Sequence, residues 1–163
     1  MSESVLSAAA ARVQQALAAR GAAFTVVELP ASTRTAADAA TAIGCTVAQI
    51  VKSLVFREVA TERPLLVLAS GVNQVDMDKL AAVVGGPMAK ADADFVRRAT
   101  GFAIGGIPPL GHVTPLVPYI DQDLLGLGEV WAAAGTPHAV FALPAATLPV
   151  LTGGIVADLR RDA

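Results

Sequence analysis

The segment Gly-Phe-Ala-Ile-Gly-Gly-Ile-Pro-Pro-Leu-Gly-His at residues 101–112 joins a short apolar run to paired glycines and paired prolines. The run at residues 102–104 has the length and composition of a buried strand. At Gly105 and Gly106 no side chain blocks the backbone and positive φ is accessible. The prolines at 108–109 then fix φ and remove two N–H donors. Two interpretations are open: a tight turn, or a backbone edge held ready against a ligand.

The totals indicate a single domain, which we expect to span residues 1–163. The chain has 163 residues, 54% of them hydrophobic and 16% charged, enough to bury a substantial core. It has no run of about 18 apolar residues that could cross a bilayer. Its first residues lack the basic start and apolar stretch of a signal peptide. One cysteine, Cys45, excludes an internal disulfide and fits a reducing compartment. We therefore expect a cytoplasmic protein without membrane contact.

The formal net charge is −2, which provides no global basic field for nucleic acid. DNA is not expected as a partner, and any RNA would be held through a local patch. Arg97 and Arg98 are either such a phosphate contact or a solvated helix face. His112, His138 and the single cysteine form no metal-binding spacing. The phosphate-binding loop, the nucleophile elbow and the dinucleotide fingerprint are missing as well. We expect neither metal nor cofactor.

Hydrophobic periodicity and cap residues predict helices and short strands in mixed order. The predicted helices cover residues 6–17, 36–43, 77–84 and 92–99, with a further one opening at Pro144, and the predicted strands cover 24–29, 50–57, 65–69, 102–104, 130–133, 139–143 and 155–159. Prolines within residues 113–120 allow only an edge or interrupted strand there. This order is not the regular alternation of a doubly wound fold. We expect an α/β fold of α+β type, with one mixed, strongly curved or barrel-like sheet surrounded by helices.

Lys52 is the one charged residue in a row of apolar side chains on one face of a predicted strand. Alternation along the strand at residues 50–57 places it on one face with Ile50, Leu54 and Phe56. A lysine there either extends its amine to solvent at the edge of the sheet or points into a cavity. A cation beside aimed backbone N–H groups can hold an anionic or carbonyl oxygen. That equipment would suit ester hydrolysis by a bound water or by a neighbouring hydroxyl of the substrate.

Five segments in the right order resemble the YbaK/EbsC family, free-standing aminoacyl-tRNA deacylases related to the editing domain of bacterial prolyl-tRNA synthetases. They are Ala-Gln-Ile-Val-Lys-Ser-Leu-Val-Phe at 48–56, Val-Asp-Met-Asp-Lys-Leu at 75–80, the glycine–proline stretch at 103–112, residues 32–40, and Gly-Thr-Pro-His at 135–138. The resemblance covers residues 12–160. It implies a barrel-like mixed sheet ringed by helices, with a pocket at one end. It also implies hydrolysis of the ester between a wrong amino acid and the 3′ adenosine of tRNA.

The resemblance carries residue roles as well. It implies that the strand lysine Lys52 anchors the substrate and that the glycine–proline loop shapes and polarises the site, which gives Lys52, Gly105 and Gly106 as catalytic residues. The substrate-binding residues it implies are Ser53, Ser70, Ile107, Pro108 and His138. Ser53 stands where relatives have threonine or asparagine, a position that bears on amino-acid choice. Some relatives lack a histidine matching His138, so a turn residue and a pocket residue are both open. Attack is by water or is substrate-assisted, with no protein nucleophile.

The sequence thus predicts a trans-editing aminoacyl-tRNA deacylase acting on Cys-tRNA(Pro)- or Ala-tRNA(Pro)-type substrates, with the amino acid left open. Its expected partners are the 3′ acceptor end of aminoacyl-tRNA and an aminoacyl-tRNA synthetase. The alternative is a non-catalytic regulatory module that binds an aminoacyl or nucleotide group. Retention of Lys52 and both loop glycines favours the enzyme, because a module would be free to lose them.

Overall fold

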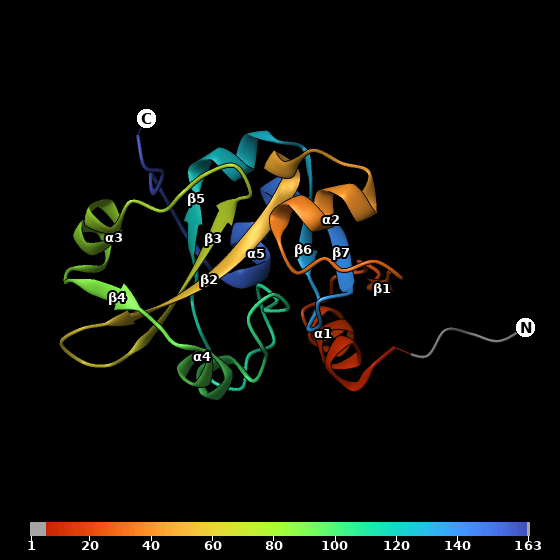
Figure 1. Cartoon of the computed structure of the whole chain (residues 1–163), viewed down its shortest axis with the longest axis horizontal. Coiled ribbons are helices and arrows are strands. Elements are labelled where there is room, and N and C mark those ends of the chain that lie inside the picture. Colours follow the sequence, from red (N-terminus) through yellow and green to blue (C-terminus); the bar gives the residue numbers. More distant parts are fainter. Residues whose placement is uncertain (1–5, 163) are drawn as a thin grey trace, which may run out of the picture.

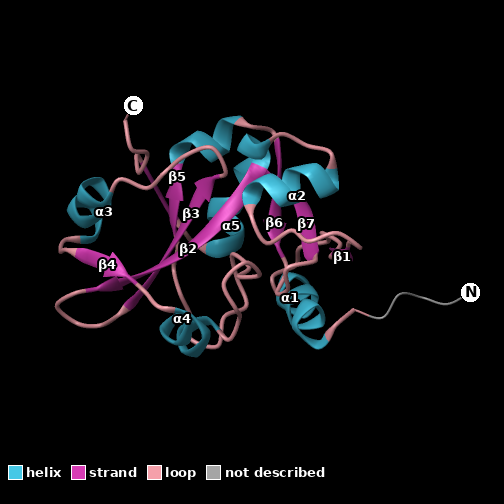
Figure 2. Ribbon diagram, viewed as in Figure 1, coloured by secondary structure: helices cyan, strands magenta, loops and turns pink. Residues whose placement is uncertain are grey.

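The computed structural model describes residues 6–162 and contains one mixed sheet with helices around it (Figures 1 and 2). The strands are β1 (Val27–Glu28), β2 (Ile50–Glu58), β3 (Pro64–Ser70), β4 (Met88–Lys90), β5 (Tyr119–Asp121), β6 (Glu129–Ala133), β7 (Ala139–Pro144) and β8 (Ile155–Ala157). The α-helices are α1 (Ala8–Ala19), α2 (Ala36–Ile43), α3 (Met77–Val84), α4 (Ala93–Thr100) and α5 (Leu148–Thr152), with short 3-10 helices at Val47–Gln49, Gln122–Gly126 and Ala145–Thr147. This confirms the predicted mixed α/β architecture.

The sheet has the order β1-β7-β6-β2-β3-β5-β8, and β4 pairs with β2 beside that path. β2 is antiparallel to β3 from Val51 opposite Ser70 to Arg57 opposite Pro64. Its other edge is shared by two short partners. β6 is parallel to it at residues 50–51, and β4 is antiparallel to it at residues 56–58. Between these partners, residues 52–55 of β2 face no neighbouring strand of the described chain. We call this gap in strand pairing beside residues 52–55 the notch in the sheet.

The two faces of β2 pack against different parts of the protein. One face lies in the main hydrophobic core, whose buried residues include Val13, Leu17, Val51, Val55, Leu66, Leu68, Phe141 and Leu148. On the opposite face Ile50 packs against Ala39 of α2, and Phe56 packs against Leu80 of α3. Lys52 lies on that face between the two apolar contacts. A lysine is tolerated in the apolar row because its half-buried amine donates to the main-chain carbonyl of Asn73.

Most predicted elements are confirmed, but the predicted strand at residues 102–104 is wrong. That segment is a loop without ladder partners. Phe102 is buried, with 2% of its surface exposed, whereas Ile104 is 48% exposed. The hydroxyl of Thr100 accepts from the N–H of Phe102 and donates to its carbonyl. The apolar run thus anchors a loop through one aromatic side chain instead of adding a strand.

Other differences concern element length and sheet position. The predicted strand at 24–29 shortens to β1. For residues 113–120 an edge or an interrupted strand was expected. The second alternative holds, because only the end of this segment is in β5, which lies between β3 and β8 and is not an edge. The helix predicted to open at Pro144 begins as the 3-10 helix Ala145–Thr147 and continues into α5, with Pro144 at its N-cap and not at its first position. The sequence did not indicate β4, a strand of three residues. No helix of residues 6–162 has both the length and the apolar character needed to cross a membrane.

We expect Asp76→Ala to lower the free energy of unfolding by about 1 kcal/mol, the usual cost of losing an N-cap. The Asp76 carboxylate accepts from the N–H groups of Asp78 and Lys79 and so caps α3. Asp78→Ala is the matched control, because Asp78 lies in the same first turn but its side chain makes no cap bond. Urea denaturation of both variants measures the difference. Equal losses would show that the capping bonds contribute nothing specific.

Candidate active site at the open edge of strand β2

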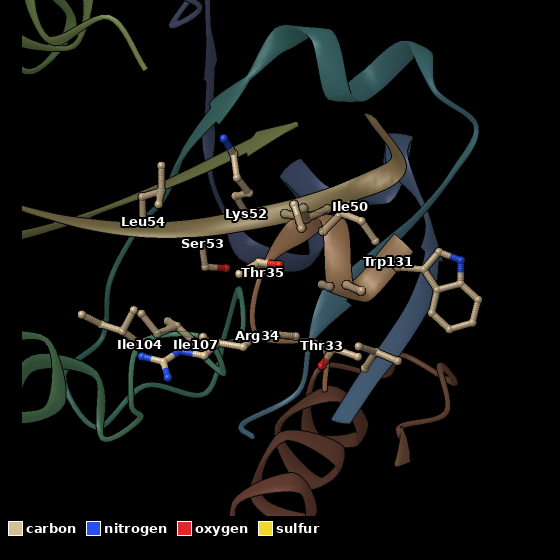
Figure 3. Close-up of a pocket in the computed structure, with 17 residues that line it drawn as sticks. Thr33, Arg34, Thr35, Ile50, Lys52, Ser53, Leu54, Ile104, Ile107 and Trp131 are labelled. Carbon is tan, nitrogen blue, oxygen red and sulfur yellow. The ribbon is translucent and has the colours of Figure 1, made fainter. Parts of the chain in front are cut away.

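A cavity of about 270 Å³ lies at the notch in the sheet (Figure 3). Its wall consists of residues 33–36 and 39 around the start of α2, residues 50–54 of β2, residues 104–105 and 107 of the glycine loop, and residues 131–133 and 140 of β6 and β7. Most of these side chains are apolar. Three of the five segments that sequence analysis singled out, those at 32–40, 48–56 and 103–112, therefore meet at one place, whereas those at 75–80 and 135–138 do not line the cavity.

Ser53 presents an unpaired peptide edge to this notch. The carbonyl of Ile50 accepts from Gly71 on the β3 side of β2, whereas the N–H of Val59 donates to Pro87 on the β4 side. Peptide groups alternate in direction along a strand, so the N–H and C=O of Ser53 lie on the notched edge. No described residue bonds to either group. A substrate can therefore bind here through main-chain hydrogen bonds.

Two hydroxyl groups in the cavity wall lack partners as well. The Oγ of Ser53 and the Oγ1 of Thr33 are buried, and neither makes a hydrogen bond within the described chain. Thr33 is held in place by its N–H, which donates to the carbonyl of Pro137 at 2.6 Å. Buried polar atoms in proteins are nearly always satisfied, and exceptions often mark functional positions. Ser53 thus carries three polar groups without partners, which supports its predicted place in the site.

The ammonium group of Lys52 points to the side of β2 opposite Ser53 (Figure 3). Its Nζ donates to the carbonyl oxygen of Asn73 at 2.5 Å. Burial lowers the pKa of Lys52, because the charged amine loses water, and the nearby carboxylate of Asp121 partly opposes this shift. Lys52 is among the residues that line the cavity, but its half-buried amine lies on the other side of the strand from Ser53 and the glycine loop. The hydrogen bond from the Lys52 amine to Asn73 was not predicted from the sequence.

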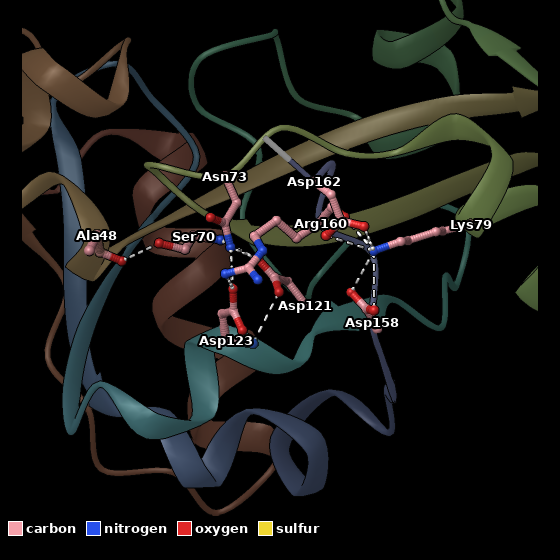
Figure 4. A network of polar contacts seen from close by, with 9 residues as sticks. All are labelled: Ala48, Ser70, Asn73, Lys79, Asp121, Asp123, Asp158, Arg160 and Asp162. Atoms are coloured by element: carbon pink, nitrogen blue, oxygen red, sulfur yellow. Dashed lines mark hydrogen bonds and ion pairs between the residues drawn. The ribbon is translucent and has the colours of Figure 1, made fainter.

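Asn73, whose carbonyl binds Lys52, also contacts a buried carboxylate through its side chain. Figure 4 shows this side-chain contact with Asp121. The side-chain amide of Asn73 donates to Asp121 at 2.7 Å and to Asp123 at 2.9 Å. Asp121 is only 1% exposed, and Arg160 bonds to Asp123 at 3.0 Å. A buried carboxylate is costly unless hydrogen bonds or a cation compensate for it. Lys52 provides that positive charge, so its site position and the stability of this network are coupled.

The glycine loop is held by contacts from two directions. Gly105 has φ +94°, and a Cβ there would lie 2.6 Å from the Cγ of Arg34. Gly106 does not have positive φ; a Cβ there would lie 2.9 Å from the backbone of Thr136. Its carbonyl accepts from the N–H of Gly135 at 2.8 Å. Both glycines are therefore required by close packing, and Ile107, which is buried, completes the loop's side of the cavity.

Three predicted substrate-binding residues do not line the cavity. Ser70 is buried and donates its hydroxyl hydrogen to the carbonyl of Ala48 at 2.7 Å. The buried Pro108 accepts at its carbonyl from Nε2 of His112. His138 is exposed, and its Nδ1 lies 3.2 Å from the carbonyl of Ala31. Of its two open roles, this geometry fits a residue that holds the turn at 135–138 against the segment before α2.

Sequence reasoning missed other wall residues, among them Thr33, Arg34 and Trp131. The first two lie in the 32–40 segment that the family resemblance included, so a signal for them existed. For Trp131 the sequence contained no signal of a site position, apart from its being the single tryptophan. Within residues 6–162, no three histidine, cysteine, aspartate or glutamate side chains gather closely enough to hold a metal ion.

Comparisons with known proteins identify the family of the chain. Residues 30–149 match the model of the family described as the aminoacyl-tRNA editing domain. The uncharacterized protein YwhH of Bacillus subtilis (strain 168) is 30% identical over 118 residues, which are 72% of this chain and 74% of that protein.

Solved structures are similar over nearly the whole chain. One, of a protein described as a candidate trans-editing enzyme for prolyl tRNA synthetase, is 54% identical with a TM-score of 0.91, covering 97% of this chain and 100% of that one. Another, of the hypothetical protein APE2540, is 28% identical with a TM-score of 0.86, covering 92% of this chain and 99% of that one.

We expect acid to destabilise the protein partly through His112, whose pKa lies below its ordinary value because burial disfavours the imidazolium. The unfolded chain binds that proton more readily, so this stability is present above about pH 6.5 and is lost as the pH falls toward the lowered pKa. His112→Gln should lose less stability than wild type between about pH 7.5 and about pH 5 in urea denaturation. His138→Gln, at an exposed position, should keep the wild-type dependence. Identical profiles for wild type and His112→Gln would contradict this assignment.

Gly105→Ala should destabilise the protein more than Gly85→Ala does. Both glycines have positive φ, which costs an alanine on the order of 1 kcal/mol. Only at Gly105 would the new methyl group also meet another side chain, the stem of Arg34, whereas the space at Gly85 is open. The difference between the unfolding free energies of the two variants measures the cost of the contact between the new methyl group and Arg34. Equal losses would mean that Arg34 moves aside without cost.

Proposed function

Because the chain belongs to the aminoacyl-tRNA editing domain family, we propose that this hydrolase of mischarged aminoacyl-tRNA works in trans, as a free-standing enzyme, at the notch in the sheet. The observation that carries the assignment to this place is the unpaired peptide edge of Ser53 facing the Gly105–Ile107 loop across a small cavity. The edge offers a donor and an acceptor at fixed positions. Such preorganised groups are what stabilise charge on an ester oxygen during hydrolysis.

In the proposed reaction, a water molecule attacks the carbonyl carbon of the aminoacyl ester, either alone or held and activated by the adjacent ribose hydroxyl of the substrate. The N–H of Ser53 donates to the oxygen that becomes negative in the tetrahedral intermediate. The bond to the ribose oxygen then breaks, that oxygen takes up a proton, and with water the products are free amino acid and tRNA. The N–H of Gly106 already donates to Ala103 at 3.1 Å. Gly105 therefore serves as part of the cavity wall, and Gly106 serves by letting the loop pack against the backbone of Thr136.

We assign to Lys52 the anchoring of the substrate. Its ammonium is held by one neutral carbonyl in the substrate-free protein, at 2.5 Å from Asn73. A partly desolvated cation interacts more strongly with a negative or polar oxygen than a fully hydrated one does. Binding requires the amine to exchange the Asn73 carbonyl for an oxygen of the substrate. Burial lowers the pKa of Lys52, and the nearby Asp121 carboxylate partly opposes this shift by favouring the charged amine.

The cavity favours a small aminoacyl group, in line with a Cys-tRNA(Pro)- or Ala-tRNA(Pro)-type substrate. Its volume is about 270 Å³, and its walls are largely apolar. The 54% identical protein described as a candidate trans-editing enzyme for prolyl tRNA synthetase supports a mischarged tRNA(Pro) and that synthetase as partners. The reaction belongs in the cytoplasm, where aminoacyl-tRNA is used.

Hydrolysis of a panel of mischarged tRNAs in single-turnover assays tests this function. We expect release of a small amino acid, and we expect Lys52→Met to lower kcat/KM by roughly 100- to 1000-fold, the usual cost of one well-placed electrostatic contact. Lys52→Met should also lower the melting temperature, because Asp121 loses its nearby cation. Cys45→Ala is the control and should keep activity, because no thiol takes part.

Folding is followed by circular dichroism in the same samples. A folded Lys52→Met variant with wild-type rates would remove Lys52 from the mechanism. A folded wild-type protein that binds aminoacyl-tRNA and hydrolyses none of the panel would favour the regulatory module instead.

A further inference from the structure

Arg34 carries a positive charge at the cavity for which the described chain provides no counter-ion. Its side chain is exposed and lines the cavity, and no carboxylate of residues 6–162 lies within ion-pair distance of it. Among the lining residues the other cation is Lys52, whose amine is already bound to Asn73. Figure 3 shows the Arg34 guanidinium beside Ile104 and Ile107, along the glycine loop.

The position of Arg34 is fixed from both sides. Its own N–H donates to the hydroxyl of Ser32 at 3.2 Å, and the preceding residue, Thr33, is tied to Pro137. Its stem crosses Gly105 in the space that a Cβ would otherwise occupy, 2.6 Å from the Arg34 Cγ. Ordering a long side chain on binding normally costs conformational entropy. That cost is reduced here because the stem is already laid against the loop.

The charges of the substrate decide which part of it Arg34 meets. An aminoacyl ester has no carboxylate, and its α-amino group is itself a cation, which a guanidinium repels. The nearest negative charge is the phosphate on the 5′ side of the terminal adenosine. Guanidinium groups bind phosphate with two parallel, charge-assisted hydrogen bonds. With a net charge of −2, the protein depends on such local contacts to hold RNA.

We propose that Arg34 binds the 5′-phosphate of the terminal adenosine and so positions the aminoacyl ester in the cavity. This inference rests on the proposed function. The amino acid enters the notch beside Ser53, and the phosphate stays outside, at the end of the glycine loop. Arg34 acts on substrate binding and not on the bond-breaking step. Its removal should therefore raise KM and leave kcat nearly unchanged.

Two substrates that differ by one phosphate test the contact. These are 3′-O-aminoacyl-adenosine and its 5′-monophosphate, each carrying the amino acid that the wild-type enzyme removes. Arg34→Gln should lower kcat/KM about 10-fold on the monophosphate, a typical loss for one charge-assisted contact, and leave the nucleoside unaffected. Arg34→Lys should recover part of the loss. Arg97→Gln, an exposed arginine of α4 outside the cavity wall, should change neither substrate.

Equal loss on both substrates, or no loss on the monophosphate, would overturn the inference while leaving the deacylase function intact. Calorimetric titration with adenosine and adenosine 5′-monophosphate measures the same contact without turnover. We expect wild type to bind the monophosphate more tightly and Arg34→Gln to lose that preference. An unchanged preference in the variant would reject the phosphate contact. Absence of hydrolysis by wild type would reject the proposed function alone.

Discussion

The structure depends on the unequal pairing of the two edges of β2. Along one edge β2 is bonded to β3 over nearly its full length. Along the other edge β6 and β4 bind only its ends, and residues 52–55 face no strand of the described chain. A central strand with a free stretch of peptide edge is normally a liability, because unpaired N–H and C=O groups attract other chains. Here a small cavity surrounds the free edge.

The cavity is enclosed by segments that are themselves held by main-chain contacts. Gly135 donates to Gly106, and Pro137 accepts from Thr33, so one turn fixes both the glycine loop and the segment before α2. Each contact requires backbone to approach backbone closely, and a side chain at Gly106 would meet Thr136. The loop segments of the site are therefore fixed to one another by main-chain hydrogen bonds and lie against the strands that complete the wall.

A second consequence of β2 is the position of its lysine. Adjacent residues of a strand point to opposite faces, so Ser53 at the cavity directs Lys52 to the other side. There the amine meets Asn73, whose amide also holds the buried Asp121. The network satisfies a carboxylate that would otherwise be costly to bury, and it keeps a partly desolvated cation next to the site. The charges of Lys52 and Asp121 thus contribute both to the stability of the fold and to the proposed binding of substrate.

The sequence by itself determined the local structure and the family. The caps at Thr35 and Asp76 and the alternation along β2 depend on residues within a few positions of each other, and the structure reproduces them. The 102–104 run failed as a strand, because an apolar tripeptide cannot show whether its backbone will find a partner. Phe102 is buried there without one.

Only the tertiary structure decided the notch, the cavity and the direction of each predicted site residue. In the folded chain Thr33 and Arg34 line the cavity, whereas Ser70 and His138 lie outside it. The Lys52 amine donates a hydrogen bond to Asn73. The physical reason is that ladder pairing joins residues distant in the chain, such as Val51 and Ala132. A free peptide edge exists only where such pairing stops. The position at which pairing stops cannot be predicted from a local sequence pattern.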